Sequence, residues 1–223
     1  MTDRENFISI AKRTGYERMP VSFQMCPDLA RRYDAYVKEH PIEVPWDVDH
    51  LPGLSATRTP PDVFLQKYYR NKTFKEGTFI NEWGVAHEPG SEAAYHMTYM
   101  HHPMDGFDSV EQIQSYPFPV FDLSNLPAMK DAADRIHASG RPALGDMATT
   151  IWERSWYMRG MENLMCDMMA EDDMATVLLD KVTDVAIMQA RAYANAGADA
   201  IFLGDDVGMQ HSIMMSIGLY EEW

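Results

Sequence analysis

Two short apolar segments separated by a long amphipathic stretch constrain the fold most strongly. The segments are residues 142–147 and 200–203, and each follows a helical pattern that ends at a glycine. The two helices are expected over residues 127–139 and 172–197, where apolar residues recur at three- and four-residue spacing. Strands that are apolar throughout and alternate with helices form parallel sheets covered by those helices. The sequence therefore predicts an α/β fold.

Acidic residues stand where each of these strands ends. Asp146 lies near the end of the first strand, and Asp205 and Asp206 follow the second. Enzymes with a (β/α)8 barrel build their active sites at the carboxyl ends of the strands. Gly204 and Gly208 are too sparse for the glycine-rich loop of a dinucleotide-binding fold. We therefore expect a (β/α)8 barrel and no nucleotide cofactor.

The first half of the chain carries weaker signals. Residues 20–25 read as a short buried strand and residues 27–40 as a helix, whereas residues 41–61 contain five prolines and read as a long surface loop. A turn signal at residues 88–91 lies between two β-like runs, so residues 77–100 are expected to form a hairpin excursion from the barrel.

The number of strands indicates an incomplete barrel. Four barrel strands can be counted, near Val21, Phe79 or Ala93, Ala143 and Ile201. Closure needs eight strands in roughly 250 residues. The chain also stops at Trp223, inside the opening of an expected helix. We therefore expect residues 1–223 to form a single domain, the N-terminal part of a barrel truncated after about its first half, which associates into a homo-oligomer or aggregates through its open edges.

Composition argues against two classes of partner. Nineteen Lys and Arg stand against 34 Asp and Glu, and the formal charge of -15 repels nucleic acid. The N-terminus is charged from Asp3 and leads into no apolar run of signal-peptide or membrane-span length. Cys26 and Cys166 form neither a CxxC pair nor a disulfide framework, which suits a reducing compartment. We therefore expect a cytoplasmic protein that binds neither nucleic acid nor membrane.

The spacing of the histidines and methionines does not favour a metal site or a ligand pocket. His96, His101 and His102 lack the i, i+4 spacing of helical zinc motifs, so we expect no metal site there. Methionines recur at helical spacing between Met158 and Met169. They are read as core filler, with an adaptable wall of a ligand pocket as the alternative.

The leading catalytic candidates are Asp205, Asp206 and Glu153. Paired carboxylates at a barrel mouth can orient a substrate, and the alternative is that one of them caps the next helix or forms an Asx turn. Gln210 can present both a donor and an acceptor to a ligand or can brace its own loop. His211 beside it is a weaker substrate-binding candidate.

Further substrate-binding candidates combine charge with aromatic neighbours. Glu153 and Arg154 stand among aromatic side chains and either line a pocket for a flat, polar ligand or form an internal ion pair. Glu82 and Trp83 in the expected hairpin, and Asp146 at its strand end, carry the same two interpretations.

Several separated motifs resemble the uroporphyrinogen decarboxylase superfamily. They are Asn81-Glu82-Trp83-Gly84-Val85, the stretch from Trp152-Glu153-Arg154 to Glu162-Asn163, and Gly204-Asp205-Asp206-Val207-Gly208-Met209-Gln210, supported by residues 102–117 and 214–223. Two activities are known in that superfamily, namely decarboxylation of uroporphyrinogen and methyl transfer between a corrinoid protein and a thiol or folate-type acceptor. The resemblance thus implies a (β/α)8 barrel and an enzyme.

One departure from the family pattern bears on the reaction. In the decarboxylases an Arg-Gln-Ala-Gly-Arg run follows the first strand and holds substrate carboxylates, whereas Met25 is followed here by Cys26-Pro27-Asp28. The resemblance therefore favours a methyltransferase of the corrinoid-linked branch acting on a small-molecule substrate. A decarboxylase (carboxy-lyase of porphyrin biosynthesis) and a non-catalytic tetrapyrrole- or corrinoid-binding module are the alternatives.

The resemblance also implies cofactors outside these residues. The thiol-activating members carry a zinc site made by His-x-Cys and a later Cys beyond the Asp-Asp loop, and this chain ends before that point. We therefore expect no cofactor within residues 1–223, zinc if a longer chain carries those ligands, and a corrinoid on a partner protein. Without the zinc, the chain is expected to be inactive by itself.

Overall fold

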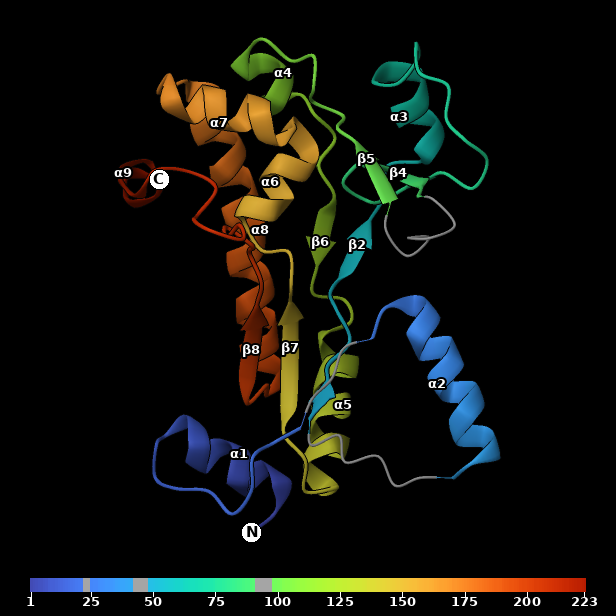
Figure 1. The fold of residues 1–223 in the computed structure, drawn as a ribbon, viewed down its shortest axis with the longest axis vertical. Coiled ribbons are helices and arrows are strands. Elements are labelled where there is room, and N and C mark those ends of the chain that lie inside the picture. The colour runs from blue at the N-terminus through green and yellow to red at the C-terminus, as the bar shows by residue number, and fades with distance from the viewer. Residues whose placement is uncertain (22–24, 42–47, 91–97) are drawn as a thin grey trace.

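The computed structural model describes residues 1–21, 25–41, 48–90 and 98–223 (Figure 1). The elements, in chain order, are α1 Asp3–Ala11, α2 Pro27–Glu39, β1 Asp49–His50, β2 Ser55–Thr57, α3 Pro61–Lys67, β3 Phe79–Ile80, β4 Ala86–Pro89, β5 Thr98–His101, α4 Val110–Gln114, β6 Val120–Asp122, α5 Leu126–Ala138, β7 Ala143–Met147, α6 Trp152–Arg159, α7 Met161–Met169, α8 Asp173–Ala196, β8 Ala200–Leu203 and α9 Ile217–Glu222. None of the helices in these residues is long and apolar enough to cross a membrane.

A parallel sheet forms the centre of the described chain. Within it β7 lies between β1 and β8, and both neighbours run parallel to β7. Helices α5 and α8 cover one face, as Figure 1 shows. Gly145 permits close packing there, because a Cβ atom would lie 2.5 Å from the Cγ atom of Tyr193. The prediction of an α/β fold with a parallel sheet is confirmed, whereas closure into a (β/α)8 barrel stays a prediction.

The helix boundaries that frame this sheet match the sequence pattern. Helix α5 ends before Gly140 and α8 ends at Gly197, and both glycines adopt positive φ angles of 77° and 96°. A left-handed backbone of this kind is open to glycine at little cost. Asp172 caps the start of α8 by accepting a hydrogen bond from the amide of Met174 at 2.8 Å. These stop and start signals explain why β7, α8 and β8 were predictable.

The strand at the edge of the sheet beside β7 is β1, and not the strand that the sequence predicts over residues 20–25. Strand β1 and strand β2 both lie within residues 41–61, so the prediction of a continuous surface loop there is wrong. Strands of two and three residues are too short to leave a recognisable alternation. Pro20, Val21 and Met25 are not in a strand, and residues 22–24 lie outside the described residues.

An antiparallel sheet occupies the segment expected to leave the barrel. Strands β3, β4 and β5 pair in that order, and the chain between β3 and β4 carries Glu82 and Trp83. The hydroxyl of Tyr69 donates to the carbonyl groups of Gly84 and His101, at 2.8 and 2.7 Å, and thereby ties this sheet to α3. The β-like run expected over residues 93–100 lies partly outside the described residues, and His96 is one of the residues outside them.

Helices α6 and α7 pack on α8 above the parallel sheet (Figure 1). Met158 and Met168 are buried in the core, as the filler interpretation predicts, whereas Met169 is 74% exposed. A buried ion pair joins the two helices, with Nε of Arg159 2.8 Å from Oδ2 of Asp167. Nη1 of Arg159 also donates to the carbonyl of Met104 at 2.7 Å. The orientation of α6 is therefore fixed at its C-terminal end.

A polar network closes the opposite end of the sheet, where the strands begin. The carboxylate of Asp199 accepts hydrogen bonds from Arg4, from Nε2 of His137 at 2.9 Å and from the amide of Ala143 at 3.0 Å. Burial alone would raise the pKa of Asp199, but the bonds from Arg4, Ala143 and His137 together lower it. The network thus joins α1, α5 and β7 to the residue that precedes β8.

Replacing Asp199 tests whether this network stabilises the fold. Because the pKa of its carboxyl is lowered in the folded protein, the charged form contributes stability above about pH 4, and that contribution is lost as the pH falls through the lowered pKa. We expect Asp199→Asn to cost about 1–3 kcal/mol at pH 7 and less at pH 3, measured by urea denaturation. Asp131→Asn, on the exposed face of α5, is the control. Equal effects of both variants at pH 7 would contradict the assignment.

Candidate active site

The loop after β8 lies directly against the loop after β7. The amide of Gly204 donates to the carbonyl of Met147, and the carbonyl of Gly204 accepts from the amide of Thr150, both at 3.2 Å. A Cβ atom at position 204 would overlap the carbonyl oxygen of Ala148. Only glycine therefore lets β8 deliver the two aspartates that follow it to the start of α6.

Asp205 caps helix α6 from another part of the chain. Its Oδ1 atom accepts hydrogen bonds from the amides of Thr150 at 3.2 Å and Glu153 at 3.0 Å, and its Oδ2 atom accepts from the amide of Ile151 at 2.7 Å. The N-cap residue of α6, Ile151, offers no side-chain cap of its own. A carboxylate at a helix N-terminus satisfies unpaired amides and interacts favourably with the helix dipole. Asp205 is thus a cap, but of the earlier helix α6 and not of the next helix, which Ser216 caps.

Asp206 and the residues beyond it make a different arrangement. Oδ1 of Asp206 accepts from the amide of Gly208 at 2.9 Å, which is an Asx turn, and the side chain is exposed. Gln210 and His211 are exposed in the following turn, which the bond from the amide of Met209 to the carbonyl of Ser212 closes. Within the described residues no hydrogen bond or ion pair joins Gln210 or His211 to α6, so their roles stay predictions.

Glu153 combines partial burial with neighbouring negative charges. Burial raises the pKa of its carboxyl, and the charges of Asp205 and Asp206 act in the same direction. The hydroxyl of Tyr157, one helical turn away, donates to Oε1 of Glu153 at 3.0 Å. Burial and the charge of Glu153 also raise the pKa of Tyr157 to about 12, so its hydroxyl stays protonated at neutral pH. The raised pKa makes this carboxylate a stronger base than an ordinary glutamate.

Arg154 is a partly buried cation without a hydrogen-bond partner among the residues described. Its guanidinium carbon lies 4.9 Å from the ring centroid of Trp83, which is 3% exposed. Burial lowers the pKa of Arg154, whereas the negative charges of Glu82 and Glu153 raise it. No ion pair joins Arg154 to Glu82 or Glu153 among the described residues, so both carboxylates lie beyond ion-pair distance. The guanidinium is therefore free to bind a ligand.

His87 joins this cluster, although no sequence signal singled it out. Its Nδ1 atom lies 2.9 Å from Oγ1 of Thr98, its Nε2 atom lies 3.1 Å from Nδ2 of Asn81, and its ring stacks on Phe79. Burial lowers the pKa of His87, and the charge of Arg154 lowers it further. The ring is therefore neutral at pH 7. Strand β4, which the sequence did not indicate, places it there.

Two further histidines, His101 and His102, form contacts within the framework. Nε2 of His101 lies 3.2 Å from Oε2 of Glu88, and Nδ1 of His102 donates to the carbonyl of Tyr157 at 2.8 Å. In the part of the chain that the structure describes, no three His, Cys, Asp or Glu residues are grouped so as to hold a metal ion.

Asp146 stands apart from the cluster at Arg154. Its side chain is exposed, and Oδ1 accepts from the amide of Ala148 at 3.0 Å. The hydroxyl of Tyr193 donates to its carbonyl at 3.2 Å. These bonds shape the loop after β7, and no described contact links Asp146 to Glu153 or Arg154, so its substrate-binding role stays a prediction.

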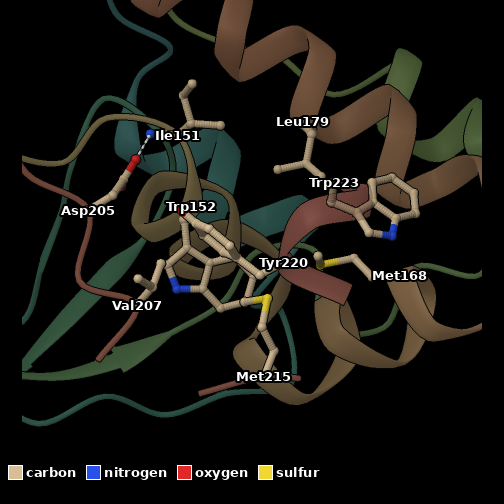
Figure 2. A pocket seen from close by; sticks show the side chains of 9 residues that line it. All are labelled: Ile151, Trp152, Met168, Leu179, Asp205, Val207, Met215, Tyr220 and Trp223. Atoms are coloured by element: carbon tan, nitrogen blue, oxygen red, sulfur yellow. Dashed lines mark hydrogen bonds between the residues drawn. The ribbon is translucent and has the colours of Figure 1, made fainter. Parts of the chain in front are cut away.

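An apolar pocket of about 200 Å³ opens beside the Asp205 cap. Figure 2 shows the carboxylate of Asp205 directed at the amide of Ile151 on its rim. The lining residues are Ile151, Trp152, Met168, Leu179, Asp205, Val207, Met215, Tyr220 and Trp223. Trp152 is 7% exposed and its Nε1 atom has no hydrogen-bond partner. The pocket thus offers an apolar wall next to the residues that position α6.

One comparison with known proteins gives a match. The family model described as Uroporphyrinogen decarboxylase (URO-D) matches residues 93–223, which is more than half of the chain. This range contains α6 and the loop after β8, and it begins after Glu82 and Trp83. No curated protein and no solved structure gives a significant match.

The two adjacent aspartates are expected to differ sharply in their effect on stability. Asp205→Ala removes the acceptor for three amides at the start of α6, so we expect a loss of about 1–3 kcal/mol. Asp206→Ala removes one bond of an exposed turn and should cost within about 0.5 kcal/mol. Urea denaturation of both variants measures the difference. Similar losses at the two positions would show that Asp205 does not anchor the helix.

Proposed function

The chain belongs to the uroporphyrinogen decarboxylase family, and we propose that it takes part in methyl transfer from a corrinoid protein to a small acceptor with one anionic group. Members of this family are generally enzymes. We propose the family's (β/α)8 arrangement for the chain, with β1, β7 and β8 as barrel strands, because the three strands are parallel and α5 and α8 cover one face of their sheet.

A single arginine among carboxylates is the observation that carries this proposal. Around Arg154 stand Glu82, Glu153 and Asp205, and no second cation of the described chain accompanies it there. A tetrapyrrole with many carboxylates would meet repulsion that one guanidinium cannot offset. An acceptor with one carboxylate or sulfonate group matches one guanidinium, which can bind it through two parallel hydrogen bonds. The charge balance therefore favours methyl transfer over uroporphyrinogen decarboxylation.

The chain's own residues would bind the acceptor and receive its proton. Arg154, held over Trp83, binds the anionic group, and the neutral ring of His87 adds no competing charge. A thiol acceptor loses its proton to Glu153 as its sulfur takes the methyl group, and Tyr157 keeps that carboxylate oriented. The corrinoid on the partner protein would supply the methyl group as a cation equivalent and keep the electron pair of the broken cobalt–carbon bond. The described residues do not fit a zinc site, so zinc enters no step here.

Binding of a matched pair of thiols tests the assignment of Arg154. We expect 3-mercaptopropionate to bind about tenfold or more tightly than 3-mercaptopropan-1-ol, since a charge-assisted hydrogen bond contributes about 1.5–3 kcal/mol. The quenching of tryptophan fluorescence and calorimetry measure both affinities. Arg154→Met should remove the preference, whereas Arg135→Met on exposed α5 should keep it. Equal affinity of the two thiols for the unaltered protein would refute the proposed role.

Turnover with pH tests the assignment of Glu153. Because residues 1–223 are expected to be inactive without the zinc ligands, turnover is measured on a longer chain that carries them. There we expect methyl transfer from methylcobalamin to 3-mercaptopropionate to increase with pH through the raised pKa of Glu153, because a base must be deprotonated to act. Glu153→Gln should lower the rate by about 10²-fold and remove this dependence, whereas Glu162→Gln, which is exposed on α7, should change neither. The release of CO2 from uroporphyrinogen without methyl transfer would establish the decarboxylase instead.

A further inference from the structure

A basic groove lies on the face of the molecule formed by α3, α4 and the turn after β5. Two adjoining hollows, of about 390 and 240 Å³, share five lining residues. These are Lys67, Tyr68, Arg70, Pro103 and Gly106. Figure 1 shows α3 and α4 at the same end of the molecule, at the end opposite to α1.

The charge of this groove is opposite to that of the chain as a whole. Lys67, Arg70 and Lys72 fall within six residues of a chain whose formal charge is -15, and all three side chains are exposed. None of them forms a hydrogen bond or an ion pair with a described residue. Nζ of Lys67 lies 5.2 Å from the ring centroid of Tyr68, and Nζ of Lys72 lies 6.0 Å from that of Tyr69. The three cations thus remain available to an anion.

One carboxylate also lines the groove. Asp105 stands at the end of the smaller hollow, where its Oδ1 atom accepts from Nδ2 of Asn163 at 3.0 Å. Three positive side chains therefore face one negative side chain that already has a donor. Gln112 and Ser115, from α4 and its C-cap, add polar groups to the larger hollow.

The groove is built on packed residues. The ring of Tyr68 lies 5.0 Å from that of Tyr116 and 5.9 Å from that of Phe107, centroid to centroid. The opposite wall is held by α6, because Arg159 donates to the carbonyl of Met104 at 2.7 Å and His102 donates to that of Tyr157 at 2.8 Å. A rigid floor lowers the conformational entropy that a ligand must remove on binding.

We propose that this groove binds a multivalent oxyanion, such as the pyrophosphate group of a small organic ligand. Three cations on one rim match an anion of charge two or more, whereas a single carboxylate would leave most of that charge without a partner. The exposed part of the aromatic floor suits an organic body attached to the anion. The site stands on these contacts alone and does not depend on the methyl-transfer proposal.

Titration with inorganic pyrophosphate at low ionic strength tests the groove. We expect binding to the unaltered protein that weakens with added salt, and a loss of affinity of at least about tenfold in Lys67→Ala/Arg70→Ala/Lys72→Ala. The matched control is Lys130→Ala/Lys181→Ala/Arg191→Ala, which changes the net charge equally at exposed positions of α5 and α8. The control should bind as the unaltered protein does.

A steric variant separates the groove from general charge effects. A Cβ atom at Gly106 would meet no atom within 4 Å, so Gly106→Leu should fold normally while its side chain fills the groove. We expect Gly106→Leu to bind pyrophosphate at least about tenfold more weakly, with an unchanged urea midpoint. No binding to the unaltered protein at millimolar pyrophosphate, or equal losses in the groove variant and its charge-matched control, would overturn the proposal.

Discussion

The carboxylate of Asp205 at the N-terminus of α6 is the interaction on which the candidate site depends. It accepts hydrogen bonds from three backbone amides at the start of α6. The N-cap residue of this helix, Ile151, provides no side-chain cap. At the other end of α6, Arg159 reaches Asp167 and Met104. A helix of eight residues is thus held at both ends by contacts from elsewhere, so its side chains are positioned by the fold and not by helix propensity.

This position gives three residues of α6 their chemical character. Burial raises the pKa of Glu153, the negative charges of the loop after β8 act in the same direction, and Tyr157 lies one turn further on the same helix face. Arg154, the next residue along, meets Trp83 from the antiparallel sheet. The residues proposed for proton transfer and for anion binding therefore lie on one helix turn, and the excess of carboxylates around them disfavours a ligand with several negative charges.

The sequence predicts the fold where its signals are local. Apolar strands, glycine stops and the cap at Asp172 locate β7, α8 and β8, because each of these signals acts within a few residues. Strand β1 is two residues long, and what makes it a strand is its pairing with β7 almost a hundred residues away. No local pattern records such a contact.

The residues of the candidate site were likewise predicted only where the sequence signal is local. Glu153, Arg154 and Asp205 were identified from charge beside aromatic residues and from the position of a strand end, but His87 was not, because only the pairing of β4 with its neighbours brings it near Arg154. The capping of α6 by Asp205 was not predicted, since sequence patterns recognise caps from adjacent residues and Asp205 lies far along the chain from α6. Long-range contacts thus account for what the sequence left open.

Hydrogen exchange at the start of α6 tests the central claim most directly. If Asp205 anchors the helix, the amides of Ile151 and Glu153 are protected in the unaltered protein and lose that protection in Asp205→Ala, while the amides of β7 and β8 keep theirs. Rapid exchange at both amides in the unaltered protein, or protection that survives the substitution, would contradict the account.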